Sequence, residues 1–204
     1  LKSSNATTMM YKRILILLIS TLSYTTIATA DKAILAGGCF WCMEADFEKL
    51  DGVTEVISGF TGGMLLNPTY SGNHKGHIEA VEIHYDSQKI TYAALLDYYW
   101  LQIDPFDAQG QFCDKGPSYV SAIFVANQQQ QAIAEQSKRN IQAQFPQQKI
   151  ATAIFNTSIF YPIRGKESYH QNYYKNNPIR YQGYRWNCGR DKRLKAIWGD
   201  KTTH

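Results

Sequence analysis

The order of apolar segments along the chain is the feature that most constrains its fold. Short apolar runs rich in β-branched residues alternate with longer segments of helical periodicity. They predict strands at 34–36, 53–60, 79–85 and 119–126 and helices at 39–50 and 92–103. The order β-α-β-β-α-β is typical of the split β-α-β core of ferredoxin-like α+β folds. We therefore predict such a core, extended by an extra helix at 127–145, an extra strand at 151–156 and a loop-rich C-terminal tail with one short helix near 191–198.

The first thirty residues have the pattern of a targeting segment. Lys12 and Arg13 precede the apolar run 14–19, and small residues follow at 28–30. We interpret residues 1–30 as a secretory signal peptide and residues 31–204 as a single domain. A retained membrane anchor is the weaker alternative, because the apolar run is too short to span a bilayer. The protein is then expected to be exported, periplasmic or secreted, and free of the membrane after cleavage.

The charge balance gives no sign of a nucleic-acid partner. Removing residues 1–30 takes away Lys2, Lys12 and Arg13 and no acidic residue, so the formal net charge falls from +4 to +1. Basic residues do gather near the C-terminus, where we expect a solvated face rather than a binding patch. They are Arg180, Arg185, Arg190, Lys192, Arg193 and Lys195.

Four cysteines remain after residue 30, and their positions suggest redox chemistry. Cys39 follows Gly37 and Gly38 and opens a predicted helix, where the helix dipole favours a thiolate. Cys42 stands three residues later, a spacing that also fits a thiol–disulfide oxidoreductase. Cys113 is interpreted as a packed or loop thiol. Cys188 lies in the tail, where mobility would let it reach another cysteine.

Glu79 is the strongest candidate for an acid. On the predicted strand it shares one face with Val81 and Ile83, which indicates that it points inward. Burial raises the pKa of a carboxyl group and suits it to donate a proton near neutral pH. A solvated glutamate at a strand end is the alternative.

The histidines give little support for a metal site. His74 and His77 stand together on a loop, far in sequence from the cysteines, whereas zinc needs about four ligands. We therefore expect no metal. His84 and His170 have no evident partners and are interpreted as structural or surface residues.

Several strings of the chain resemble A-type peptide methionine sulfoxide reductases. They occur in the same order as in that family and span about 34–198, nearly all of the predicted mature chain. The strings are Gly38-Cys39-Phe40-Trp41, Gly62-Gly63, Asn67-Pro68-Thr69-Tyr70, Gly76-His77-Ile78-Glu79-Ala80-Val81, and the loop from Asp114 to Tyr119. The two strings that contain Cys39 and Glu79 are together highly specific.

The resemblance implies a role for each of these side chains. Cys39 would attack the sulfur of the S epimer of methionine sulfoxide, free or in proteins, while Glu79 protonates the oxygen. Tyr70 and Tyr119 would hydrogen-bond that oxygen, and Asp114 would position substrate or water. Phe40 and Trp41 would hold the methyl group of the substrate. Residues 31–204 would then be one catalytic domain.

The resemblance also implies a catalytic cycle. Cys39 would become a sulfenic acid, which a second cysteine resolves to a disulfide. An external dithiol, such as a thioredoxin-like protein, would restore the enzyme without a bound cofactor. Apart from the resemblance, we expect the chain to be a monomer. Many relatives have glycine where this chain has Cys42. We expect Cys188 to be the resolving residue, with Cys42 as its rival and Cys113 behind both.

Two other classes remain open from the residues alone. One is a thiol–disulfide oxidoreductase that uses Cys39 and Cys42. The other is an exported binding module whose cysteines form structural disulfides.

Overall fold

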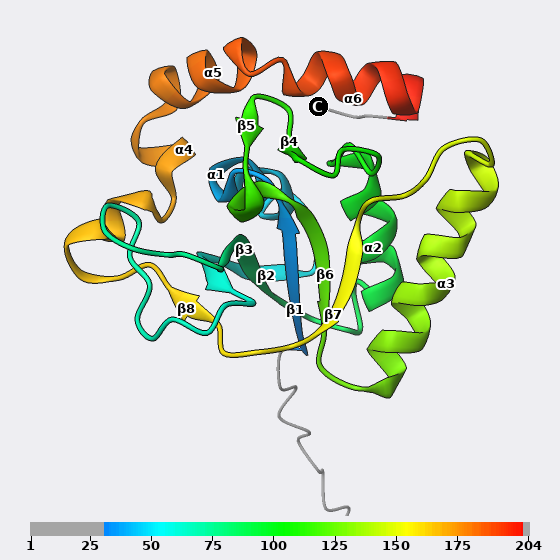
Figure 1. Ribbon diagram of the computed structural model, residues 1–204, viewed down its shortest axis with the longest axis horizontal. Helices are drawn as coiled ribbons and strands as arrows, with labels where there is room; N and C mark the ends of the chain where they lie inside the picture. Colours follow the sequence, from blue (N-terminus) through cyan, green and yellow to red (C-terminus); the bar gives the residue numbers. More distant parts are fainter. Residues whose placement is uncertain (1–30, 202–204) are drawn as a thin grey trace, which may run out of the picture.

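A six-stranded sheet forms the centre of the protein in a computed structural model that describes residues 31–201 (Figure 1). Its strands are β1 (Asp31–Gly37), β2 (Val53–Thr61), β3 (Ile78–Tyr85), β6 (Ser121–Val125), β7 (Ala153–Asn156) and β8 (Tyr161–Pro162). They lie in the order β7-β6-β1-β3-β2-β8. A separate hairpin pairs β4 (Gly110–Gln111) with β5 (Asp114–Lys115).

The four central strands have the predicted ferredoxin-like topology. β3 lies between β1 and β2 and is antiparallel to both, and β1 is antiparallel to β6 on its other side. β7 extends the sheet parallel to β6. The predicted α+β fold with its extra strand is therefore confirmed.

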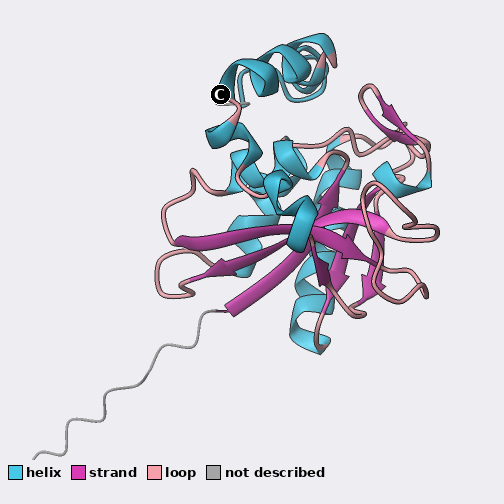
Figure 2. Ribbon diagram, turned by 90° about the vertical axis from the view of Figure 1, so that its left-hand side faces the viewer, coloured by secondary structure: helices cyan, strands magenta, loops and turns pink. Residues whose placement is uncertain are grey.

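Helices cover the sheet and form most of the C-terminal region (Figure 2). They are α1 (Phe40–Phe47), α2 (Tyr92–Leu101), α3 (Gln128–Gln144), α4 (Tyr173–Asn176), α5 (Pro178–Asn187) and α6 (Arg190–Trp198). Short 3-10 helices occupy Pro117–Tyr119, Gly165–His170 and Gly199–Lys201. None of the helices within 31–201 is both long and apolar enough to cross a membrane.

Strand alternation divides the core into two layers. Ala33 and Leu35 of β1 belong to the large buried cluster that includes side chains of α1, α2 and α3. Ala36 instead faces a smaller cluster on the other side of the sheet, with Ala80 and Phe124. This is the two-residue period expected of a strand that is buried on both faces.

The C-terminal tail contains more helix than the sequence predicted. α6 confirms the expected short helix near 191–198, but α5 lies where we expected loop. The buried residues of α5 are Tyr181 and Arg185. Because one of them is an arginine, the buried face of this helix lacks the apolar pattern from which a helix is predicted.

Two of the C-terminal basic residues are not on a solvated face, so that expectation was wrong for them. Arg190 is 1% exposed and Arg185 is 9% exposed. Arg185 donates to both carboxylate oxygens of the buried Asp46, each at 2.9 Å. The predicted signal peptide lies outside the described residues.

Candidate active site

Cys39 sits at the junction between β1 and α1, where two glycines turn the chain. Gly38 has φ +81°, a left-handed conformation that side chains disfavour. A Cβ on Gly37 would lie 2.4 Å from the sulfur of Met43, so the turn leaves no room for larger residues there. Cys39 is the N-cap of α1, and its carbonyl accepts from the Cys42 N–H at 3.1 Å. The predicted position at a helix N-terminus is thus confirmed.

Cys39 and Cys42 are free thiols that are both buried in the same cluster of side chains. Burial, followed by the interaction with Cys42, raises the pKa of Cys39 well above its usual value. The lowered thiol pKa expected from the helix dipole was therefore wrong, because desolvation disfavours the thiolate more strongly. The pKa of Cys42 is lowered, chiefly by the hydrogen bond from Cys39 and also by the charges of Arg190 and Arg185.

Glu79 points inward from β3, as the strand period predicted, and is 1% exposed. Its Oε2 accepts from the backbone N–H of Phe40 at 3.3 Å, and among the described residues its Oε1 has no hydrogen-bond partner. Burial raises the pKa of Glu79 to about 8, although the bond from Phe40 opposes the shift. The group is therefore mostly a neutral acid at pH 7 and can donate a proton.

Two tyrosine hydroxyls share the electrostatic environment of Glu79 and Cys39. Burial raises the pKa of Tyr70 to about 12, with further contributions from Glu79 and Cys39. Burial also raises the pKa of Tyr119, with Glu79 as the next cause. Both hydroxyls remain protonated at neutral pH and are available as hydrogen-bond donors. The structure thus brings together four of the residues that the sequence singled out.

Asp114 lies on the β4–β5 hairpin and is held by a residue that the sequence analysis missed. Its Oδ2 accepts a 2.5 Å hydrogen bond from the hydroxyl of Tyr184, and burial raises its pKa. Tyr184 also lowers the pKa of Cys39, although burial outweighs this effect. The only sequence signal for Tyr184 is its place one helical turn before Cys188.

An aromatic wall adjoins the thiol. Phe40 is 1% exposed, whereas Trp41 is half-buried and stacks on Tyr173 with ring centroids 3.9 Å apart. The indole N–H of Trp41 donates to Nδ1 of His170 at 3.0 Å. His170 therefore has a defined partner, contrary to the expectation that it had none. The side chain orients one of the predicted substrate-binding aromatics.

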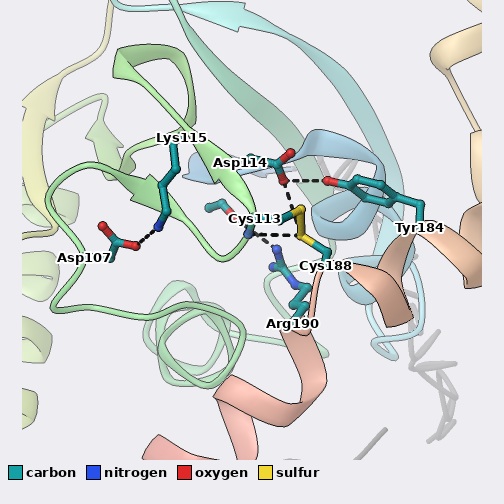
Figure 3. The surroundings of a disulfide bond; sticks show 8 residues. Asp107, Cys113, Asp114, Lys115, Tyr184, Cys188 and Arg190 are labelled. Carbon is teal, nitrogen blue, oxygen red and sulfur yellow. Dashed lines mark hydrogen bonds and ion pairs between the residues drawn. A yellow bond between two sulfur atoms is a disulfide. The ribbon is translucent and has the colours of Figure 1, made fainter.

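Cys113 and Cys188 form a disulfide across 75 residues of sequence (Figure 3). The interpretation of Cys113 as a packed or loop thiol was therefore wrong, since the pairing depends on how the tail folds back over the β4–β5 hairpin. The Cys188 sulfur also lies 3.9 Å from Oδ2 of Asp114. In this state the predicted resolving cysteine is bonded to Cys113, while Cys39 and Cys42 are free thiols.

The loop histidines have structural partners. His77 accepts from the Gly63 N–H at Nδ1, and its Nε2 lies 2.8 Å from the Leu65 carbonyl. His74 contacts the Thr69 carbonyl through Nδ1 at 3.1 Å. In the described part of the chain, the one group of side chains close enough to share a metal is Cys113, Asp114 and Cys188, and its two sulfurs are joined to each other.

These features place a buried thiol beside a protonated carboxyl group and two hydroxyl donors. Such a site can protonate an oxygen atom while a sulfur nucleophile attacks its neighbour. Together with the additional cysteines, the fold and the site define a cysteine-dependent oxidoreductase.

Comparison with known proteins identifies the family. The model of the peptide methionine sulfoxide reductase family matches residues 31–202, and the chain belongs to this family. It is 46% identical to peptide methionine sulfoxide reductase MsrA 2 of Caulobacter vibrioides over 172 residues, which cover 83% of this chain and 86% of that protein.

Solved structures with a similar fold include a bacterial and a yeast protein. Methionine sulfoxide reductase A of Corynebacterium diphtheriae matches with a TM-score of 0.64 and 29% identity, over 76% of this chain and 77% of that one. Mxr1 from Saccharomyces cerevisiae, solved in complex with Trx2, shares the fold with a TM-score of 0.51 and 21% identity, over 76% of this chain and 91% of that one.

Proposed function

We propose that the protein reduces the S epimer of methionine sulfoxide, free or in proteins, to methionine. The observation that carries this function is the buried, protonated Glu79 in the same site as the Cys39 thiol. A sulfoxide oxygen is a poor leaving group until it is protonated, so a nucleophilic sulfur needs a neutral acid beside it. Membership of the family supports the same reaction.

Protons balance within the site. Glu79 donates its proton to the sulfoxide oxygen as the Cys39 sulfur attacks the substrate sulfur. The proton of the Cys39 thiol returns to the carboxylate of Glu79, and the oxygen leaves methionine on Cys39 as a sulfenic acid. Tyr70 and Tyr119 donate hydrogen bonds to the oxygen, and Asp114, held by Tyr184, positions substrate or water.

The configuration at the substrate sulfur is selected by an apolar side and a polar side of the site. Phe40 and Trp41 offer apolar surface for the methyl group, while the acid and the hydroxyls attract the oxygen. A chiral sulfoxide can present both groups correctly in one configuration only. The contact between Trp41 and His170 fixes the indole of this wall.

A second cysteine resolves the sulfenic acid to a disulfide, and an external dithiol reduces that disulfide. Cys188 remains the predicted resolving residue and Cys42 its rival. Yeast Mxr1 bound to Trx2 supports a thioredoxin-like protein as the reductant, and no bound cofactor is needed. The alternative of a simple thiol–disulfide oxidoreductase is disfavoured, because burial raises the pKa of Cys39.

Export and a monomeric state complete the proposal. The basic and apolar pattern of residues 1–30 supports a cleaved signal peptide and a periplasmic or secreted enzyme. N-terminal sequencing of the protein recovered from the producing cells should start near Asp31, and light scattering should give the mass of one chain.

Substituting the nucleophile tests the reaction. Cys39→Ser should abolish methionine formation from the S-sulfoxide, whereas the unaltered protein should convert the S epimer and leave the R epimer intact. The products are separated by chiral chromatography, and circular dichroism checks that the variant is folded. Methionine formation by folded Cys39→Ser at the rate of the unaltered protein would exclude the proposed function.

A further inference from the structure

The segment that carries Tyr70 is a loop without helix or strand. It spans residues 62–77, between β2 and β3. Several of its hydrogen bonds stay inside the loop: the Thr69 N–H donates to the Asn73 carbonyl at 3.0 Å, and the Asn73 N–H donates to the Thr69 hydroxyl at 3.2 Å. A side chain on a loop is placed less precisely than one on a helix or strand. The position of the Tyr70 hydroxyl therefore depends on what holds this loop to the rest of the protein.

Glu167 holds the loop at Tyr70 itself. Its Oε2 accepts from the Tyr70 N–H at 2.8 Å, and its Oε1 accepts from the Ser71 N–H at 2.8 Å and from the Ser71 hydroxyl. Among the hydrogen bonds of the described residues, these are the ones that join residues 64–76 to a residue outside the loop. The loop and the segment before α4, which contains Glu167, lie side by side in Figure 1.

The charge of Glu167 strengthens this contact. Burial opposes the shift, but the bonds from Ser71 and Tyr70 lower the pKa of Glu167, so its carboxylate is ionised at neutral pH. Hydrogen bonds to an ionised acceptor are stronger than those between neutral groups. Both oxygens of one carboxylate thus bind two consecutive N–H groups of the loop.

The 3-10 helix Gly165–His170, which contains Glu167, is itself anchored to the sheet. Gln171 directly follows it and bonds to β2 as a backbone amide would. Its Oε1 accepts from the Ser58 N–H at 2.9 Å, and its amide nitrogen donates to the Ser58 carbonyl at 2.7 Å. The same nitrogen donates to the Ile163 carbonyl at 3.1 Å. Glu167 is therefore held against the edge of the sheet on which the loop begins.

The last residue of this 3-10 helix contacts the other side of the site. His170 accepts the indole N–H of Trp41 at 3.0 Å, and its ring centroid lies 4.0 Å from that of Tyr70. One short helix thus holds the polar side of the site through Glu167 and the apolar side through His170. The distance between the hydroxyl of Tyr70 and the aromatic wall is set by this helix.

We propose that Glu167 is a positioning residue that holds the Tyr70 hydroxyl where the sulfoxide oxygen binds. The idea rests on the proposed function, in which that hydroxyl donates a hydrogen bond to the oxygen. Glu167 does not touch the substrate, because it acts through the backbone of Tyr70 and Ser71. A donor that is already in place costs no reorganisation when the bond between sulfur and oxygen breaks.

A double-mutant cycle tests whether Glu167 acts through the hydroxyl. Glu167→Ala should lower kcat/KM for the S-sulfoxide by about 10- to 100-fold. The loss should appear mostly in kcat, because the hydroxyl stabilises the transition state more than the bound substrate. In Tyr70→Phe, which lacks the hydroxyl, the same change at Glu167 should lower kcat/KM by less than about twofold.

Two further variants serve as controls. Lys166→Ala changes the exposed neighbour of Glu167 and should keep kcat/KM within about twofold of the unaltered protein. Glu167→Gln keeps one acceptor oxygen for the loop, so its loss should be smaller than that of Glu167→Ala. Urea denaturation checks that each variant is folded at the assay temperature. If Glu167→Ala does not fold, the same cycle is measured with Glu167→Gln.

The cycle separates positioning from a general structural role. An equal loss of kcat/KM on changing Glu167 in the unaltered and the Tyr70→Phe backgrounds would show that Glu167 acts independently of the hydroxyl and would overturn the proposal. Unchanged kcat/KM in folded Glu167→Ala would overturn it as well. Both results would leave the proposed function standing, whereas an unaltered protein that forms no methionine from the S-sulfoxide would defeat the proposed function.

Discussion

At the scale of single residues, burial raises the pKa of both reacting side chains, Glu79 and Cys39, and leaves both uncharged. Desolvation disfavours both the carboxylate of Glu79 and the thiolate of Cys39, so each holds its proton near pH 7. The acid that the substrate oxygen needs is thereby present at rest. The nucleophile is generated only when a base accepts its proton, which Glu79 can do after it has donated its own.

The pH dependence of kcat/KM should follow the ionisation of Glu79. Its pKa is raised to about 8, so it is protonated below that value and loses its proton as the pH rises through it. kcat/KM of the unaltered protein should therefore fall above about pH 8, and Glu79→Gln should lower kcat/KM by about 10²- to 10⁴-fold at pH 7. Steady-state rates with S-sulfoxide from pH 5 to 9.5 provide the measurement.

The glutamine variant also serves as the control for this assignment. It cannot ionise, so its remaining activity should lack the decline that Glu79 causes. A decline of the same size and midpoint in Glu79→Gln would assign the pH dependence to another group.

At the scale of elements, Glu44 ties α1 to two other parts of the fold. Ser58 of β2 donates to its Oε2 at 3.2 Å, and the Asn172 N–H, just before α4, donates to its Oε1 at 2.8 Å. The carboxyl is fully buried, and burial raises its pKa to about 7. Since the pKa in the unfolded chain is lower, the folded form binds this proton more tightly, and its contribution to stability decreases as the pH rises from about 4.5 to 7.

Glu44→Gln should therefore stabilise the protein at alkaline pH only. Glutamine can accept the same N–H and bond to Ser58 without a buried charge. We expect the free energy of unfolding to rise by about 2 kcal/mol at pH 8 and to change little at pH 5, where the glutamate is already protonated. Urea denaturation at the two pH values measures this difference, and an equal change at both would contradict the role of ionisation.

The helices and strands were predictable to different degrees. β1, β3 and α2 carry apolar residues at the period of their own secondary structure, so their existence and order follow from local pattern. α5 does not, because its buried face is formed by a tyrosine and an arginine. The buried partner of Arg185 is the carboxylate of Asp46, 139 positions away in the chain.

At the scale of the whole molecule, buried charges attach the C-terminal helices to the catalytic core. Asp46 of α1 is fully buried and pairs with Arg185 of α5 at 2.9 Å and with Arg190 of α6 at 3.9 Å. Removing one partner of a buried ion pair leaves the other charge without compensation. The tail that carries Tyr184 and Cys188 therefore depends on a carboxylate of α1, the helix that begins at Cys39.

Asp46→Asn should lower the free energy of unfolding by about 3–5 kcal/mol, because both arginines lose a buried counter-charge. Asp191→Asn is the matched control, since Asp191 pairs with the same Arg185 but its side chain is 46% exposed. Its effect should stay below about 1 kcal/mol. Urea denaturation of both variants at pH 7 provides the comparison, and equal losses would contradict a special role for the buried pair.

The sequence by itself determined the order of the core strands and helices, the family and the position of Cys39 at the start of a helix. Those properties depend on local periodicity and on short strings such as Gly38-Cys39-Phe40-Trp41. Only the tertiary structure decided the protonation of Cys39, the place of Tyr184 and the pairing of Cys113 with Cys188. These depend on burial and on contacts between residues far apart in the chain, which no local pattern encodes.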